Sequence, residues 1–346
     1  MLLKIILKLE NTFKHDDKNN IQYLWNNLIM RKILIYYSQK SYGGVDTHLA
    51  NLINNWPSQN DQFIILTNAN NSGLSFLQKN ISKNNFEIIT TSNLYDFNND
   101  QWKVSKGLIW VKDNIKFIYE FIVKIRKIKP YIIISNNGGY PGGITCFTSS
   151  IISKFYTRNQ SVFMLIHHAP DEKRSKIAFL ADFLVIICRL LSINFITVSL
   201  ASEKMLLENT PIKKLKVIYN GISVKKISWH KNKIRKMYNI NKNKAIIGII
   251  GPLDPHKGHH TILKVFKNSV SIREKSQLVI VGRGVNEYES SLKKITKEYN
   301  IENNVTFTGF LDGDSSKIIS EFDMLAMPTI DFEAFGYSMA EAMSVK

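Results

Sequence analysis

The sequence predicts an α/β protein with two successive domains, each built around a parallel β-sheet. Two observations lead to this fold class. Short runs of β-branched and aromatic residues alternate with segments of helical periodicity, which favours parallel strands joined by right-handed crossovers. The alternation also occurs twice, on either side of a polar and basic stretch at residues 223–244. A chain of 346 residues is long enough for two domains of ordinary size.

The first domain is expected over residues 30–222. Its buried strands are predicted at Ile33–Tyr37, Phe63–Thr67, Phe86–Thr90, Tyr131–Ser135, Val162–Ile166, Phe195–Val198 and Lys216–Tyr219. The clearest helices between them are predicted at Val45–Asn55, Ser105–Lys129, Ile144–Tyr156, Arg174–Leu191 and Leu200–Glu208. Pro130 and the glycine cluster at 138–143 separate these elements. Residues 1–29 precede the first strand and are expected to be an N-terminal extension.

The second domain is expected over residues 245–346, after a junction at 223–244. Its strands are predicted at Ala245–Ile250, Gln277–Val281, Val305–Thr308 and Met324–Met327. Its helices are predicted at Gly258–Asn268, Glu287–Tyr299, Ser315–Glu321 and Ala334–Met343. Nucleotide-binding sheets of this type usually have about six strands. Four strands therefore lead us to expect an incomplete domain, truncated at its C-terminus.

The chain carries a formal net charge of +18. Nucleic acid, an anionic membrane surface or a phosphorylated ligand would each suit that charge. A second explanation accounts equally well for part of this charge. The chain is rich in Lys, Asn and Ile, which is typical of proteins from AT-rich genomes. No nucleic-acid-binding motif accompanies the charge, so we expect no nucleic-acid partner. Cys146 and Cys188 lie in apolar segments, which predicts buried free thiols in a reducing, cytoplasmic compartment.

The most informative segment is 331–343, in which Glu333 and Glu341 stand eight residues apart. If this segment is helical, the spacing corresponds to a rise of roughly 12 Å, which would set the carboxylates near opposite ends of one polyhydroxylated ligand. Carboxylates only accept hydrogen bonds, so they suit sugar and ribose hydroxyls. On its own, such a pair on a helix is usually solvated. The functional reading depends on the other motifs.

Three further motifs follow predicted strands. Gly43 and Gly44 come after the first strand and would let the backbone approach a ligand, although a plain strand-to-helix turn is the alternative. Gly251 begins a turn that ends at Lys257, beside a helix N-terminus, where an ammonium group and free N–H groups favour a diphosphate. His167 and His168 end the fifth strand, where such folds bind ligands, and His167 fits the strand end better.

Together these motifs resemble retaining glycosyltransferases of family 4, which have the GT-B fold of two Rossmann-like domains facing a cleft. The Glu333 and Glu341 pair resembles the E-x7-E motif, and the turn to Lys257 resembles the family's G-R-L-x-x-x-K-G segment, with Pro252 in place of the usual Arg. Asn220-Gly221 is similar to the family's pNGi signature, which is a structural turn. The resemblance covers residues 31–346.

The resemblance implies transfer of a sugar from a nucleotide diphosphate donor to an acceptor hydroxyl, with retention. Lys257 would stabilise the leaving diphosphate, Glu341 would bind the ribose, and Glu333 would bind the donor sugar. Gly43, Gly44 and His167 would shape the sugar and acceptor side, and Gly251 would let the nucleotide approach. The family does not usually need a metal, so we expect no cofactor beside the donor. The acceptor is expected to be a glycan or a lipid-linked sugar of surface polysaccharide or glycolipid synthesis.

Other classes remain open. A truncated, inactive homologue that binds nucleotide sugars is favoured by Pro252 and by the early end of the chain. A dinucleotide oxidoreductase is disfavoured because no G-x-G-x-x-G follows Ile33–Tyr37. The segment Trp110–Lys129 mixes apolar residues with six Lys or Arg residues, so peripheral binding to the inner, anionic face of the cell membrane competes with an ordinary surface helix.

Overall fold

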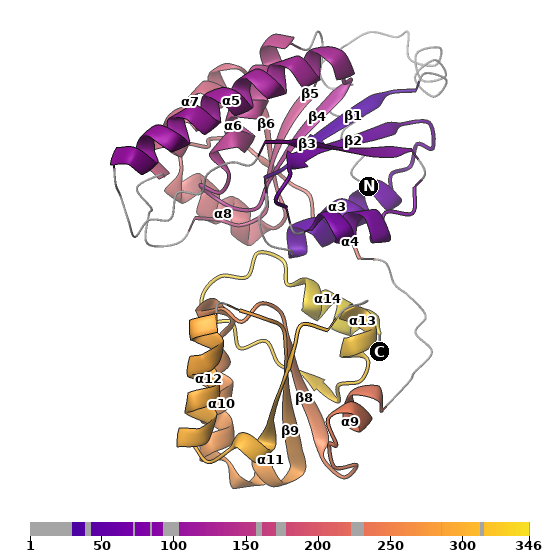
Figure 1. Cartoon of the computed structure of the whole chain (residues 1–346), viewed down its shortest axis with the longest axis vertical. Coiled ribbons are helices and arrows are strands. Elements are labelled where there is room, and N and C mark those ends of the chain that lie inside the picture. The colour runs from indigo at the N-terminus through magenta and orange to yellow at the C-terminus, as the bar shows by residue number, and fades with distance from the viewer. Residues whose placement is uncertain are drawn as a thin grey trace. The chain divides into compact units, whose positions relative to one another are not determined.

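The computed structural model describes residues 30–38, 43–71, 73–83, 85–92, 104–156, 161–170, 178–222, 232–284, 286–311 and 315–345. The chain forms two compact units, Met1–Gly221 and Ile222–Lys346, each described here by itself (Figure 1). The expected extension at 1–29 and residues 223–231 of the expected junction lie outside the described residues. Residues 232–244 belong to the second unit, where Ile234 and Ile240 pack into its core.

The first unit contains a seven-stranded sheet in the order β3-β2-β1-β4-β5-β6-β7, and every pair of neighbours is parallel. The strands are β1 (Lys32–Tyr36), β2 (Gln62–Asn68), β3 (Phe86–Thr91), β4 (Ile132–Asn137), β5 (Ser161–Ile166), β6 (Asn194–Thr197) and β7 (Lys216–Val217). The strand order reverses between β1 and β4. Loops that leave the carboxyl ends of these two strands diverge, which creates the usual ligand-binding edge of such a sheet.

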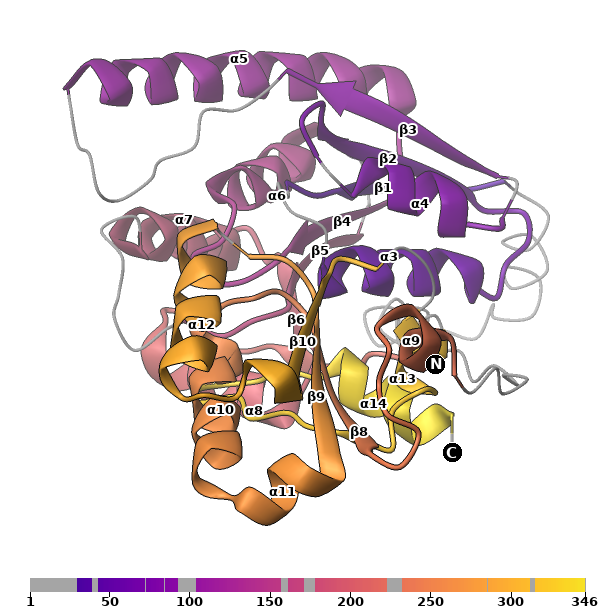
Figure 2. The same ribbon diagram turned by 60° about the horizontal axis from the view of Figure 1, so that its bottom comes forward.

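Six helices of the first unit lie within the described residues. They are α3 (Gly44–Asn54), α4 (Leu74–Asn80), α5 (Val104–Ile128), α6 (Ile144–Tyr156), α7 (Ala178–Leu190) and α8 (Leu200–Asn209). Right-handed crossovers place α3 and α4 on one face of the sheet and α5, α6 and α7 on the other, as Figure 2 shows. The sheet is therefore covered on both faces, which explains why its strands are apolar throughout.

The core of the first unit centres on β1, where residues 33–36 and the following Tyr37 are fully buried. Tyr36 meets two aromatic side chains of α5, with ring centroids 5.2 Å from Phe117 and 5.6 Å from Phe121. Phe117, Phe121 and Ile125 recur every four residues, so they form a single stripe that seals α5 against the sheet.

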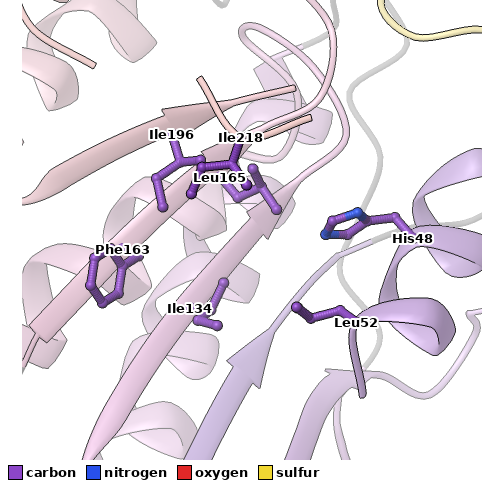
Figure 3. Close-up of a pocket in the computed structure, with 7 residues that line it drawn as sticks. All are labelled: His48, Leu52, Ile134, Phe163, Leu165, Ile196 and Ile218. Carbon is purple, nitrogen blue, oxygen red and sulfur yellow. The ribbon is translucent and has the colours of Figure 1, made fainter. Parts of the chain in front are cut away.

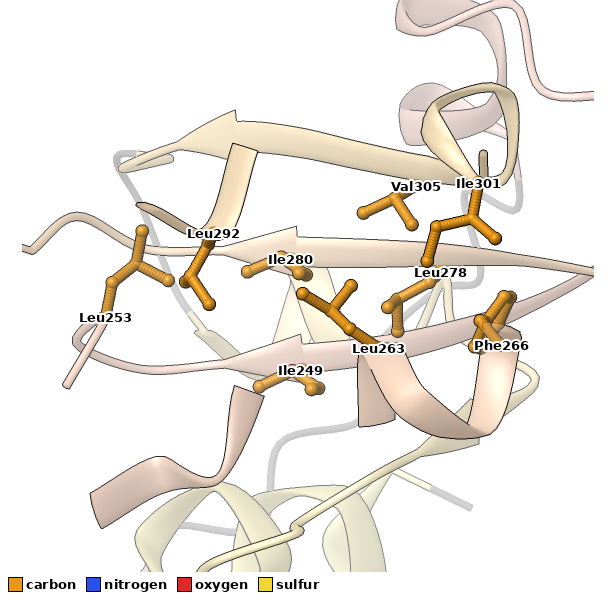
Figure 4. Packing of buried hydrophobic residues seen from close by; sticks show 9 residues of the cluster. All are labelled: Ile249, Leu253, Leu263, Phe266, Leu278, Ile280, Leu292, Ile301 and Val305. Atoms are coloured by element: carbon orange, nitrogen blue, oxygen red, sulfur yellow. The ribbon is translucent and has the colours of Figure 1, made fainter. Parts of the chain in front are cut away.

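The second unit contains a four-stranded parallel sheet in the order β10-β9-β8-β11. Its strands are β8 (Ala245–Ile250), β9 (Ser276–Val281), β10 (Val305–Gly309) and β11 (Met324–Leu325). Its helices are α9 (Lys233–Met237), α10 (His259–Asn268), α11 (Val270–Lys275), α12 (Asn286–Glu298), α13 (Ser315–Ile319) and α14 (Tyr337–Ser344), with short 3-10 turns η1 (Pro255–Lys257) and η2 (Glu302–Asn304). Side chains from the strands, α10 and α12 interlock in the core that Figure 4 shows: Ile249, Leu253, Leu263, Phe266, Leu278, Ile280, Leu292, Ile301 and Val305.

The α/β class and the parallel sheets predicted from the sequence are confirmed, and every predicted strand is present within two residues at each end. The helices α4, α9 and α11 were not predicted, because each has only five to seven residues and too few turns to show a periodicity. The predicted helix start at Arg174 lies outside the described residues, and within them one predicted boundary is wrong. The helix expected at Ala334–Met343 begins at Tyr337, since Gly336 adopts a left-handed conformation with φ +74°.

Candidate functional site

Glycines line the carboxyl edge of the second sheet. Gly251, Gly282 and Gly309 lie at the ends of β8, β9 and β10, and the N–H of Gly282 donates to the carbonyl of Gly309 at 2.9 Å. Gly282 has φ +146°, and a Cβ there would lie 1.8 Å from the carbonyl oxygen of Gly251. The turns after β8 and β9 therefore pack backbone to backbone, which leaves this edge open to close approach by a ligand.

The turn after β8 delivers Lys257 to the start of α10. The carboxylate of Asp254 accepts from the N–H of His256 at 2.9 Å and caps the turn η1. Gly258 then reverses the chain with φ +69°, and α10 begins at His259. A Cβ on Gly258 would lie 1.8 Å from the carbonyl oxygen of Pro328. The ammonium group of Lys257 is thus held one residue before a helix N-terminus, where anions are stabilised.

The loop after β11 lies against this turn, because β11 pairs with β8 in parallel. Three links join the two loops. The N–H of Ile330 donates to the carbonyl of His256 at 3.0 Å, and Nδ1 of His256 lies 2.7 Å from Oδ2 of Asp331. Nζ of Lys257 donates to Oε2 of Glu333 at 2.5 Å. The structure therefore brings together Lys257 and Glu333, which are 76 residues apart in the sequence.

Glu341 lies on α14, whereas Glu333 lies in the loop before it. The two carboxylates therefore do not share one helix, and the rise of a continuous helix does not apply to them. Between them Tyr337 places its hydroxyl in a buried position without a hydrogen-bond partner in the described part of the chain. Burial, and next the carboxylate of Glu341, raise the pKa of Tyr337. Tyr337 thus remains a neutral donor beside Glu341.

Arg283 is a cation at this edge to which the sequence analysis gave no role. Its carbonyl accepts from the N–H of Leu253 at 3.0 Å, so it sits at the end of β9 beside the turn that carries Pro252. The side chain is exposed and makes no hydrogen bond or ion pair with the described residues. The signal that could have identified it is a cation between two glycines, Gly282-Arg283-Gly284, directly after a predicted strand.

Gly43 and Gly44 form the start of α3 in the first unit, with Gly43 as the N-cap residue. Asp46, which the sequence analysis did not single out, fixes this turn. Its carboxylate accepts from the N–H of Gly43 at 2.9 Å and from the hydroxyl of Tyr37 at 3.1 Å. Asp46 is fully buried, and burial raises its pKa, although the hydrogen bonds from Gly43 and Tyr37 oppose the shift.

His167 follows β5 and is buried, whereas its neighbour His168 is half-buried. Nε2 of His167 lies 2.7 Å from Oδ1 of Asn136, and its ring meets that of His48 edge to face at 4.7 Å. Nδ1 of His168 donates to the carbonyl of Ala169 at 2.8 Å. Burial, and next the neighbouring His48, lower the pKa of His167 well below its usual value. Burial also lowers the pKa of His48, to about 4. The rings of His48 and His167 are therefore both neutral at pH 7.

A small cavity of about 20 Å³ lies under His48 (Figure 3). It is lined by His48, Leu52, Ile134, Phe163, Leu165, Ile196 and Ile218. A single water needs about this volume and two to four polar partners, and this lining offers only one polar side chain. The cavity is therefore a packing defect in the core and cannot hold a sugar or nucleotide. Among the described residues, no group of three or more His, Cys, Asp or Glu side chains could hold a metal.

Residues 230–346 match the family described as Glycosyl transferases group 1. An uncharacterised glycosyltransferase of Methanocaldococcus jannaschii is 30% identical over 152 residues, which are 42% of this chain and 38% of that protein. A GDP-mannose-dependent phosphatidylinositol monomannoside mannosyltransferase of Corynebacterium glutamicum is 28% identical over 136 residues, or 36% and 35% of the two chains. The chain thus matches well under half the length of these relatives.

The fold is also found in solved structures. The Anabaena protein HepE (Alr3699), in complex with UDP and glucose, superimposes with a TM-score of 0.68 over 91% of this chain and 78% of its own, at 19% sequence identity. That likeness extends over both units and identifies the fold. Residues 230–346 of this α/β chain thus resemble a Glycosyl transferases group 1 domain, and the chain as a whole has the GT-B fold.

Proposed function

We propose that this protein transfers a sugar from a nucleotide diphosphate donor to an acceptor hydroxyl, with retention of the anomeric configuration. The observation that carries the proposal is the contact between Lys257 and Glu333 at the carboxyl edge of β8 and β11, one residue before the N-terminus of α10. A cation, a helix N-terminus and a hydrogen-bond-accepting carboxylate together suit the diphosphate and the sugar of one donor.

The leaving diphosphate would be stabilised by Lys257 and the first N–H groups of α10. Negative charge develops on this group as the glycosidic bond breaks, and fixed positive charge lowers the energy of that transition state. Arg283 supplies a second cation from the neighbouring strand end, in place of the Arg that Pro252 replaces. Glycine at position 251 would allow the nucleotide to lie against the backbone.

The hydroxyl groups of the donor would be bound by the two carboxylates. Glu333 would accept from the sugar, and Glu341 would accept from the ribose, with Tyr337 as a neutral donor beside it. When the donor diphosphate binds Lys257, Glu333 exchanges part of its contact with the ammonium group for sugar hydroxyls. No metal and no further cofactor enters this scheme.

The first unit would supply the acceptor side. Gly43, Gly44 and His167 lie at the carboxyl ends of β1 and β5, which is the ligand-binding edge of a parallel sheet. His167 is neutral, so it can exchange hydrogen bonds with sugar hydroxyls without carrying charge. The acceptor would be a glycan or lipid-linked sugar used in the cytoplasm for surface polysaccharide or glycolipid synthesis.

Calorimetric titration of the full chain with UDP-glucose and GDP-mannose tests the donor site. These donors follow from the UDP complex of HepE and the GDP-mannose dependence of the mannosyltransferase. Lys257→Gln should weaken binding at least tenfold, while Lys264→Gln, an exposed lysine on α10, should leave binding unchanged. A folded protein that binds neither donor, nor UDP, nor GDP contradicts the proposal. Retention is tested separately by the anomeric configuration of the product in NMR.

A second candidate function is nucleotide-sugar binding without catalysis. It is favoured by Pro252, which occupies the position of a cation in the family that the motifs resemble. Donor binding without hydrolysis or transfer to any glycan acceptor would support this alternative. Turnover that is lost in Lys257→Gln would rule it out.

A further inference from the structure

The helix α5 is apolar on its outer side as well as on the side that faces the sheet. Phe117, Phe121 and Ile125 are buried against the sheet. On the opposite side an exposed stripe recurs every four residues: Val111 is 47% exposed, Ile115 62%, Tyr119 69% and Val123 49%. An ordinary surface helix has polar residues at such positions. This second stripe therefore serves something other than the core of the first unit.

The helix α7 repeats the pattern independently. Its buried side consists of Ala178, Ala181, Val185 and Cys188. Its outer side exposes four large apolar side chains at helical spacing: Phe179 is 83% exposed, Phe183 56%, Ile186 43% and Leu190 79%. Single exposed apolar residues are common, but two complete stripes on helices of the same layer mark an interaction surface.

Both stripes belong to the same layer of the first unit. The helices α5, α6 and α7 cover one face of the sheet, and α6 packs against α5 on one side and α7 on the other (Figure 2). The last turn of α6 adds Phe155, which is 71% exposed. We call the outer stripes of α5 and α7, residues 111, 115, 119, 123, 179, 183, 186 and 190, the α5/α7 surface.

The charge around the α5 stripe is positive. Lys112 and Lys116 are exposed and stand directly next to Val111 and Ile115. Three further exposed cations follow at the end of the helix: Arg126, Lys127 and Lys129. Both acidic residues of α5, Asp113 and Glu120, are only half-exposed, and Glu120 accepts from the N–H and hydroxyl of Ser92. Lys116 forms a long ion pair of 3.9 Å with Glu120, but the cations around the stripe outnumber the two acidic residues of the helix, so the net charge there is positive.

We propose that the α5/α7 surface docks on an anionic lipid bilayer. Aromatic and aliphatic side chains would enter the headgroup region, while the flanking lysines extend to lipid phosphates. Two copies of this protein would both carry positive charge on the α5/α7 surface, so electrostatic repulsion opposes their pairing through it. None of the described helices has the length and apolar content that crossing a bilayer requires.

This inference goes beyond the proposed sugar transfer and does not depend on it. Every residue of the α5/α7 surface lies in the first unit, whereas the donor contacts Lys257 and Glu333 lie in the second. Docking would bring the protein to lipid-linked acceptors, so it narrows the acceptor class from glycans in general to those carried at a membrane surface.

Flotation of the full chain with vesicles tests the proposal. Vesicles of phosphatidylcholine with 30% phosphatidylglycerol should bind the protein, and pure phosphatidylcholine vesicles should bind it far less. Tyr119→Ser combined with Phe179→Ser should lower the partition coefficient at least tenfold. Lys112→Gln combined with Lys116→Gln should lower it about 25-fold, because each basic residue near an anionic surface contributes about fivefold.

Two matched controls accompany these variants. Val270→Ser removes an apolar side chain of the second unit that is 57% exposed, and Lys213→Gln with Lys214→Gln removes two exposed charges elsewhere in the first unit. Both should keep at least half of the wild-type binding. Circular dichroism and denaturant unfolding check that each variant is folded. Two results would overturn the proposal: wild-type protein that does not bind anionic vesicles, or wild-type protein that dimerises in solution through Tyr119 and Phe179.

Discussion

The N–H of Leu253 donates to the carbonyl of Arg283 at 3.0 Å, which fixes Arg283 beside the turn that leads to Lys257. Pro252 stands where the family that the motifs resemble has an Arg. We propose that the guanidinium group of Arg283 takes over the role of that missing cation. A guanidinium can bind phosphate oxygens in bidentate fashion, so the substitution need not cost donor affinity.

Arg283→Gln is therefore expected to weaken binding of UDP or GDP about tenfold to a hundredfold, the effect of losing one charge-assisted hydrogen bond of about 1.5–3 kcal/mol. Arg283→Lys should restore part of the loss. Calorimetry with the free nucleotide measures the effect, and Lys294→Gln, a lysine of α12 that is 79% exposed, is the control. Equal affinities for Arg283→Gln and wild type would show that Arg283 does not contact the diphosphate.

Glu341→Ala is expected to weaken donor binding more than Glu287→Ala, an exposed residue of α12. The reason is the loss of an acceptor for ribose hydroxyls, again worth about 1.5–3 kcal/mol. Titration with the intact donor gives the affinities. Similar small effects of both substitutions would count against the role of Glu341.

Gly258→Ala should destabilise the second unit by at least about 2 kcal/mol. The left-handed conformation of Gly258 is unfavourable for alanine, and the added Cβ would lie 1.8 Å from the carbonyl oxygen of Pro328. Gly221→Ala is the matched control, because nothing lies within 4 Å of a Cβ at that position. Denaturant unfolding monitored by circular dichroism compares the two. A Gly258→Ala protein as stable as the control would mean that the contact with Pro328 relaxes freely.

His48 is expected to make the first unit less stable in mild acid. Burial lowers its pKa to about 4, whereas an unfolded histidine titrates near 6.5. Between these values the unfolded chain binds the extra proton, so stability is full above pH 6.5 and falls as the pH drops toward 4. From pH 7.5 to pH 5 the loss should be about 2 kcal/mol. Denaturant unfolding at both pH values should show that the free energy of unfolding falls less in His48→Gln than in the wild type. An equal fall in both proteins would exclude His48 as its source.

Much of the architecture could be predicted because the strands are short, continuous apolar runs. The run of Ile33 to Tyr37, for example, is fully buried and lies in the middle of its sheet. The short helices were not predicted. The late start of α14 was not predicted either, because a single glycine in a left-handed conformation, Gly336, determines where that helix begins. Residue spacing alone therefore suggested a common helix for Glu333 and Glu341, which the structure does not contain.

The pairing of Lys257 with Glu333 could be anticipated only through the motifs that contain them. The contact depends on the parallel pairing of β11 with β8, and nothing local in the sequence encodes that pairing. Arg283 and Asp46 were missed for a related reason. Each is held by a contact with another segment: the carbonyl of Arg283 accepts from the N–H of Leu253, and the carboxylate of Asp46 accepts from the hydroxyl of Tyr37. The roles of the candidate residues in binding and catalysis stay predictions until they are tested.

The buried carboxylate of Asp46 makes the first turn of α3 sensitive to a distant glycine. A Cβ at Gly73 would lie 2.0 Å from Oδ1 of Asp46, although the backbone of Gly73, with φ −77°, could accept any residue. A side chain there would push the carboxylate away from the N–H of Gly43, 30 residues earlier. The residue at position 73 is thus constrained by a turn that begins 30 positions earlier in the chain, and relatives that place a larger residue there should also have changed residue 46.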